Sequence, residues 1–157
     1  MIKNSVFHRK SEKGQSFVEL GLSMVFLLIL LAAVIDLGWA FFTIIALRDA
    51  AQEAATVGSI CPNNKPKIIE RLKASASDPI DMTKLEAGQI EVCIVSAGSN
   101  TCDANQTPVL GKSVQVSITY DHEIVTPLVG GFIGTQKYPI KVTSADTILR
   151  LNCDAIQ

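Results

Sequence analysis

Two carboxylates are the first candidates for chemistry in this chain, because they border or interrupt a long apolar stretch. Glu19 comes just before the stretch, and Asp36 is the only ionisable side chain within Leu20–Leu47. A charge at membrane depth is costly unless it is paired. Each carboxylate is therefore expected to find a cation or hydrogen-bond donors, either in another molecule or in the headgroup region.

The remaining candidates are four cysteines and the Asp121-His122-Glu123 cluster. The cluster could hold a metal ion, but His122 has the same strand phase as Ile118 and Tyr120, which favours a partly buried histidine. No close pair of cysteines is present, so a zinc site is not expected. The sequence shows no nucleophile elbow, phosphate-binding glycine loop or catalytic pair of carboxylates. We predict no enzyme activity, no cofactor, no metal and no small-molecule substrate.

The apolar stretch predicts one membrane-spanning helix. Leu20–Leu47 holds no proline and no polar face before Arg48. At about 1.5 Å per residue it is about 42 Å long, more than the roughly 30 Å of a bilayer core. We place the span at about residues 20–42. A secretory signal cleaved after Gly38-Trp39-Ala40 is the alternative, but the apolar run is too long and continues past that site.

The helical pattern does not stop at the end of the span. Ala46, Ala50 and Ala54 recur every four residues, and no helix breaker precedes Gly58-Ser59 and Pro62. One continuous helix over residues 15–60 is predicted. Small residues allow close packing, so the alanines contact either the chain's own sheet or other subunits. For residues 20–45 the sequence offers no internal partner, which leaves lipid or other subunits.

Charge predicts the orientation. The segment before Gly14 carries a net charge of +3, whereas the part from Arg48 onward has 10 basic and 12 acidic residues. Positive charge beside a span stays in the cytoplasm, so residues 61–157 are predicted to lie outside it. The near-neutral total, −1, gives no basic surface for nucleic acid.

The exported part is predicted to be a small α+β domain. A short helix is expected within residues 62–78, where Ile68, Ile69 and Leu72 share a face. Three strands follow at Gln89–Val95, Val114–Ile124 and Tyr138–Leu151, with a bulge near Ser144–Asp146 where the alternation changes phase. Turns containing Gly and Pro separate them. A three-stranded antiparallel meander on the end of the long helix is the simplest arrangement.

All four cysteines follow the span, in a compartment where disulfides form. Three pairings are possible. We favour Cys93–Cys102, which would close a short hairpin, together with Cys61–Cys153, which would join the end of the long helix to the last strand. Either bond would stabilise the fold by about 2–4 kcal/mol. A free thiol at Cys93 is the alternative.

Several segments resemble the TadE-like family, the minor pseudopilins of tight-adherence (Flp-type) pilus systems in bacteria. The resemblance begins with Gly14–Leu20 (GQSFVEL), Ile35–Phe41 (IDLGWAF) and Leu47–Ala55 (LRDAAQEAA). It continues near the end of the chain in Val114–Tyr120, Val125–Gly130 and Ile140–Arg150. The family often has a proline near the position of Val25, which is absent here. A pilin-like fold is implied.

The resemblance implies a mechanism. A prepilin peptidase would cut between Gly14 and Gln15 on the cytoplasmic side and release the leader, residues 1–14. Glu19 would become the fifth residue of the mature chain, where it would neutralise the new amino group of a neighbouring subunit. The alternative for Glu19 is a place at the headgroup boundary with no partner. Asp36 would either point to the outer headgroups or form a hydrogen bond between subunits.

Two functions therefore compete. In the first, this is a processed subunit of a Flp/Tad pilus assembly system, anchored in the cytoplasmic membrane and acting in pilus biogenesis or adherence. Its partners would be the peptidase, other pilin and pseudopilin subunits and membrane lipid. In the second, it is a single-pass membrane protein whose outer domain binds a partner without entering a pilus.

Overall fold

A single long helix organises the molecule. The computed structural model describes residues 13–76, 80, 85, 87–96, 99, 101–102, 106–126, 129–131 and 134–153, so nearly all of the expected leader lies outside the described residues. The elements in order are α1 (Lys13–Ile60), α2 (Lys65–Ser75), the short 3-10 helix η2 (Ala87–Gln89), β1 (Ile90–Val95), β2 (Ser113–Glu123) and β3 (Lys137–Thr147). The predicted α+β class, with a long helix, a short helix and a three-stranded antiparallel sheet, is confirmed.

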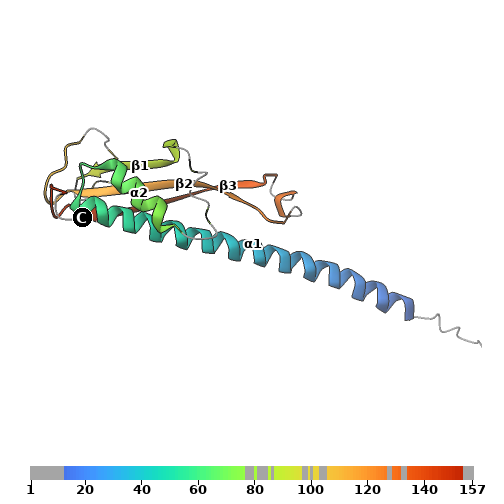
Figure 1. Ribbon diagram of the computed structural model, residues 1–157. Helices are drawn as coiled ribbons and strands as arrows, with labels where there is room; N and C mark the ends of the chain where they lie inside the picture. Colours follow the sequence, from blue (N-terminus) through green and yellow to red (C-terminus); the bar gives the residue numbers. More distant parts are fainter. Residues whose placement is uncertain are drawn as a thin grey trace, which may run out of the picture.

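Helix α1 runs unbroken for 48 residues, close to the predicted range. It contains no proline, and its last turn closes with a hydrogen bond of 2.8 Å from Cys61 N to Val57 O. Pro62 follows and cannot continue the helix. Figure 1 shows the sheet and α2 gathered along the C-terminal half of α1, while the N-terminal half extends away from them.

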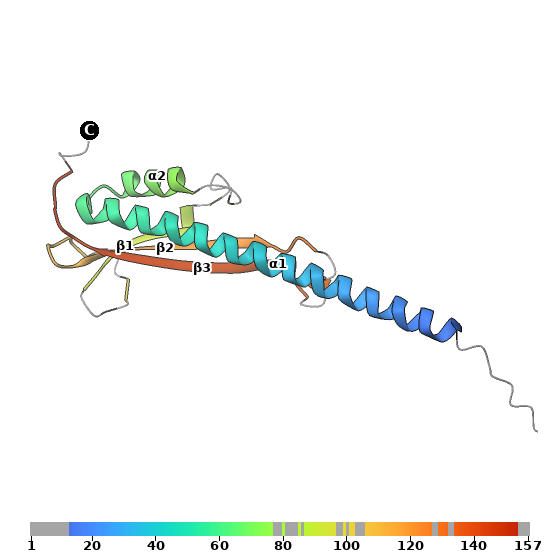
Figure 2. The same cartoon turned by 90° about the horizontal axis from the view of Figure 1, so that it is seen from below.

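The sheet is a meander in the order β1-β2-β3, with both pairs antiparallel. Figure 2 shows it running along α1, with α2 on the other side of the helix. The β2–β3 register continues without interruption from Ser113↔Thr147 to Glu123↔Lys137, so the bulge expected near Ser144–Asp146 was a wrong prediction. The phase changes because β3 ends at Thr147, and the chain then turns toward α1, where Leu149 N donates to Ser59 O at 2.8 Å.

The core lies between the second half of α1 and the sheet. Leu47 and the alanines at 50, 51, 54 and 55 are fully buried on α1. They belong to one core cluster with Val114, Val116 and Ile118 of β2. A Cβ added to Gly58 would lie 2.7 Å from Val114 Cγ1, which shows how closely the helix approaches the strand. The alanine stripe therefore serves the chain's own sheet.

Helix α2 is capped at its start and packs beside α1 through one apolar face. The Asn64 side chain accepts a hydrogen bond from Lys67 N at 3.1 Å, which caps the first turn. Ile68 and Leu72 are buried, as their spacing predicted. The helix contacts α1 and closes one side of the core.

Candidate functional site

The expected cleavage bond lies at the start of α1. The helix begins at Lys13, so the bond between Gly14 and Gln15 is in the first turn. The first N–H groups of a helix have no partner within it, which makes this turn the easiest part to unwind. Both residues are exposed, and a Cβ added to Gly14 would meet nothing within 4 Å. A protease could therefore reach this bond.

Glu19 is exposed on α1, one turn beyond that bond. Its backbone oxygen accepts a hydrogen bond from Ser23 Oγ at 2.8 Å. Within the described part of the chain, no salt bridge or side-chain hydrogen bond satisfies its carboxylate. Its expected partner in a second subunit stays a prediction.

The surface of α1 around and beyond Glu19 is apolar on every side. Most of its large side chains are more than half exposed, among them Phe17, Leu22, Phe26, Leu27, Leu31 and Val34. The described residues contain one helix that is long and apolar enough to span a membrane. Its apolar stretch is not buried by the chain itself, so this helix is a candidate membrane anchor.

Asp36 has a partner within the chain, which neither sequence-based alternative included. Only 8% of the residue is exposed. Its carboxylate accepts hydrogen bonds from Val125 N at 3.2 Å, from Thr126 N at 3.3 Å, and from the Thr126 hydroxyl. These donors belong to the connection after β2, so Asp36 fixes that connection to α1. The statement that residues 20–45 lack an internal partner is wrong at this point.

A second contact lies two turns further along the same face. Thr43 is buried, and its hydroxyl donates to Trp39 O at 3.0 Å and lies 3.2 Å from Nδ1 of His122. His122 is half-buried and faces α1, as its strand phase predicted. Glu123 instead forms an ion pair with Lys137, with Oε1 and Nζ 3.2 Å apart. Across the described residues, no three metal-ligating side chains are grouped to hold an ion.

A cavity of about 430 Å³ adjoins this contact. Its lining includes Trp39 and Thr43 of α1, with Tyr120 and His122 of β2 and Lys137 of β3. It lies where β2 extends past its pairing with β1, which stops at Ile118. The described lining gives it a mixed polar and aromatic character with no evident catalytic arrangement.

The four sulfurs form two disulfides, Cys61–Cys153 and Cys93–Cys102, with Cα–Cα distances of 4.9 and 5.5 Å. This is the pairing that we favoured from the sequence. The first bond joins the end of α1 to the segment after β3 across a separation of 92 residues. It acts together with the bonds from Leu149 and Arg150 to Ser59 O at 2.8 and 3.3 Å, which fix the same two segments.

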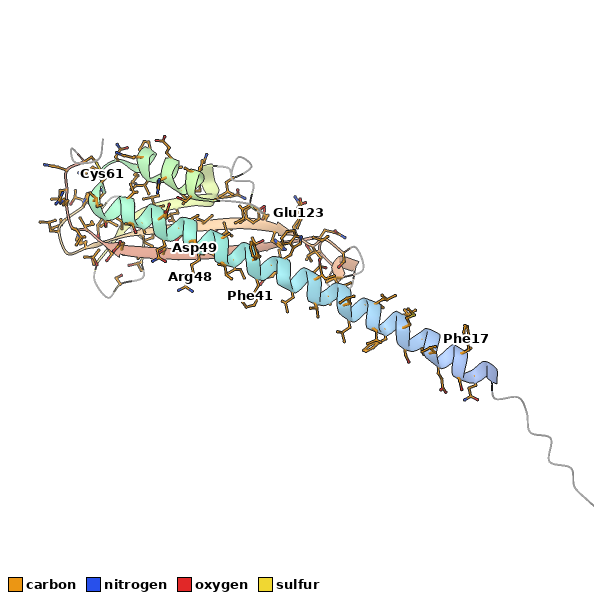
Figure 3. All side chains as sticks on the ribbon, turned by 60° about the horizontal axis from the view of Figure 1, so that its bottom comes forward. Phe17, Phe41, Arg48, Asp49, Cys61 and Glu123 are labelled. Atoms are coloured by element: carbon orange, nitrogen blue, oxygen red, sulfur yellow. A yellow bond between two sulfur atoms is a disulfide. The ribbon has the colours of Figure 1, made fainter. Side chains whose placement is uncertain are left out.

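A charged cluster holds α2 to the exposed side of α1. Glu53 accepts a hydrogen bond from the Ser75 hydroxyl and forms an ion pair with Arg71, with Nε and Oε2 3.1 Å apart. The Ser75 hydrogen bond, assisted by the positive charge of Arg71, lowers the pKa of the Glu53 carboxyl below its ordinary value. Figure 3 shows that Phe41 and Arg48 lie on the side of α1 opposite to α2.

Sequence reasoning missed the two contacts of Asp36 and Thr43. A signal for them was present, since residues 36, 40, 43, 47, 50 and 54 follow helical spacing and form the face that the structure buries wholly or partly. The apolar residues around this face concealed it. A buried stripe cannot be recognised by contrast when the opposite face is also apolar.

The comparisons with known proteins agree with the family resemblance. The family described as TadE-like protein matches residues 14–56, which is α1 without its first residue and its last turn. The comparison with curated proteins gave no match, and neither did the comparison with solved structures. The TadE-like match over α1 suggests a protein related to the Tad pilus.

Proposed function

We propose that this TadE-like chain is a minor pilin-like subunit of a bacterial Flp/Tad pilus assembly system, processed by a prepilin peptidase and acting in pilus biogenesis or adherence. The observation that supports this most strongly is the exposed half of α1. It combines the TadE-like match, the Gly14–Leu20 motif and an apolar surface that the described part of the chain leaves uncovered.

The membrane span in this proposal covers Gln15–Ile35. Asp36 and Thr43 contact the domain formed by the rest of the chain, and His122 at Thr43 is flanked by two exposed carboxylates. Charged groups of this kind belong outside the hydrocarbon core. The span therefore ends earlier than the 20–42 range expected from the sequence. At about 1.5 Å per residue, Gln15–Ile35 is about 32 Å long, close to the roughly 30 Å of a bilayer core, and Glu19 near its inner end is the one charge in the span that needs a partner.

In this arrangement the N-terminus is cytoplasmic and the residues from Asp36 onward are extracytoplasmic. Cleavage before Gln15 creates an amino group at the inner membrane face. Glu19 is exposed one turn away and can pair with the amino group of a neighbouring subunit. Each charge lowers the cost of placing the other near lipid. The apolar surface of Gln15–Ile35 then contacts either lipid or the same helix of other pilins.

Processing tests this function directly. The full chain is co-expressed with an active prepilin peptidase, extracted in detergent and weighed by mass spectrometry, and the expected product begins at Gln15. Gly14→Val should block cleavage because a protease cleft requires little bulk there. Gly21→Val is the matched control, since both glycines have open space around them, and it should be cut normally.

An intact Met1 in the presence of active peptidase, or a product beginning at Phe41, would contradict the proposal. In a piliated strain, Glu19→Ala should reduce pilus assembly, whereas Glu91→Ala, at an exposed carboxylate on β1, should leave it unchanged. Normal piliation with Glu19→Ala would remove that residue from the mechanism. The alternative function, a static membrane-anchored binding protein, predicts neither cleavage nor an effect of Glu19.

A further inference from the structure

The connection between β2 and β3 carries no charge. It lies at the end of the sheet nearest the N-terminal half of α1. Its thirteen residues, 124–136, include no charged side chain. The residues that flank it, Glu123 and Lys137, form an ion pair with 3.2 Å between Oε1 and Nζ. Figure 1 shows this end of the sheet beside α1, where the helix leaves the domain. The charged pair marks the point beyond which the hairpin has no charges.

The height of this connection along α1 is fixed by Asp36. The N–H groups of Val125 and Thr126 donate to its carboxylate, as does the Thr126 hydroxyl. Asp36 is the first residue beyond the span proposed above. The connection is therefore held at the outer boundary of the hydrocarbon core.

Backbone groups in this connection are hydrogen bonded within the chain. Ile124 N donates to Gln136 O at 2.9 Å, Gly130 N to Thr126 O at 3.3 Å, and Gly134 N to Gly130 O at 2.9 Å. Gly134 has φ = 79°, a conformation that favours glycine. A segment that contacts lipid must satisfy its own backbone, because water is not available there. Five N–H groups among the described residues of this connection, those of Ile124, Val125, Thr126, Gly130 and Gly134, meet that requirement.

Exposure points the same way. Val125 is 58% exposed although its N–H is bound to a buried carboxylate. On α1, Ile29 and Ala32 are half-buried, whereas the other residues between 14 and 35 are exposed. They lie seven and four residues before Asp36, on the same helical face. The face of α1 that leads to Asp36 is therefore less exposed than the rest of the helix for about two turns into the proposed span.

We propose that the start of the β2–β3 connection, at Val125 and Thr126, rests in the outer leaflet of the bilayer that α1 spans and forms a second lipid contact. This inference depends on the proposed function only through the membrane span. The partner is the bilayer itself, because the connection continues the apolar surface of α1 at the same height. Contacts through both α1 and the connection restrict the tilt of the domain relative to the membrane. A single spanning helix would not restrict it.

Tryptophan fluorescence in proteoliposomes tests this contact. In a Trp39→Phe background, a single tryptophan is placed at Val125, at Phe26 within the span, or at Leu110. Leu110 is the matched control, since it is 59% exposed and precedes β2 at the opposite end of the sheet. Lipids brominated on their acyl chains should reduce the emission of Val125→Trp and Phe26→Trp and leave Leu110→Trp unchanged.

The three positions separate the possible failures. Quenching at Phe26 without quenching at Val125 would overturn the lipid contact and leave the span intact. No quenching at either position would remove the span and the contact together. Equal quenching at Val125 and Leu110 would also overturn the proposal, since the domain would then lie flat on the bilayer.

A smaller substitution gives a second readout that does not depend on accommodating an indole. Val125→Cys and Leu110→Cys are treated with a membrane-impermeant maleimide in proteoliposomes. The slower reaction is expected at residue 125, and equal rates would contradict the contact.

Discussion

The two halves of α1 have the same secondary structure in different surroundings. Between Gln15 and Ile35 the helix carries large apolar side chains that are exposed on nearly every side. From Asp36 to Ile60 one face is buried against the sheet, and most of its residues beyond Leu47 are alanine or glycine. Beyond Leu47, side-chain size rather than hydrophobicity distinguishes the face that packs on the sheet from the exposed half of the helix.

The physical reason is the distance between backbones. A sheet and a helix that share a small core approach closely only where the helix has small side chains. Gly58 of α1, which faces Val114 of β2, is an example. A larger side chain at Gly58 would hold the sheet away from the helix at that point. In lipid no such limit applies, because acyl chains adapt to large side chains.

The largest expected difference between the halves is in the effect of a Leu→Ala substitution on the free energy of unfolding. Leu47→Ala removes a side chain with 0% exposure from the core and should lower the free energy of unfolding by about 2–5 kcal/mol. Leu27→Ala, at a residue that is 62% exposed, should leave it unchanged. Denaturant unfolding of the whole chain in detergent, followed by circular dichroism, measures both. Similar losses would mean that the two halves are not distinct.

The boundary between the halves depends on Asp36. Its hydrogen bonds with Thr126 involve a charged acceptor and should contribute about 1.5–3 kcal/mol. A double-mutant cycle with Asp36→Ala and Thr126→Val isolates the side-chain part of this interaction in the same unfolding assay. Additive effects would show that the Thr126 hydroxyl contributes nothing to this contact and would leave only the backbone donors of Val125 and Thr126 to hold the connection.

The same Gly→Ala substitution should have opposite effects on stability at two positions of α1. Gly58→Ala places a Cβ 2.7 Å from Val114 Cγ1 and should destabilise the domain by about 1–3 kcal/mol through overpacking. Gly38→Ala meets nothing within 4 Å. It should be neutral or stabilise the helix by up to about 1 kcal/mol, because alanine is the better helix former. Melting temperatures of the two variants, compared with that of the unaltered chain, decide between these outcomes.

The smallest expected effect is a pH dependence at Glu53, on the exposed side of the packed half. Its pKa is lowered by the Ser75 hydrogen bond and by Arg71, so folding favours the charged carboxylate. The stabilisation is present above the ordinary pKa of glutamate and is lost as the pH falls through the lower value of the folded state. Glu53→Gln should flatten the stability profile slightly in that acidic range. An unchanged profile would show that the ion pair contributes nothing.

Most of the fold could be predicted from the sequence, because the signals are local. The absence of proline and the alanine spacing predicted a helix over residues 15–60, and the structure has Lys13–Ile60. Alternating apolar residues predicted all three strands, whose bounds are within one or two residues at most ends. The exception is the end of β3, where alternation continues past Thr147 although pairing stops.

The candidate site divides in the same way. The TadE-like motif around Gly14 and Glu19 was recognisable because it is contiguous, and the family match includes it. The surroundings of Asp36 were not, because its donors lie 89 and 90 residues further along the chain. No local pattern specifies which residue of a later connection will reach a given helical turn.

The sequence by itself determined that an apolar helix leads into a small α+β domain, since composition and periodicity are properties of neighbouring residues. Only the tertiary structure decided where the helix leaves the domain. That point depends on the register of α1 against β2 and β3, which the close packing at Gly58 and the Asp36–Thr126 hydrogen bonds fix together.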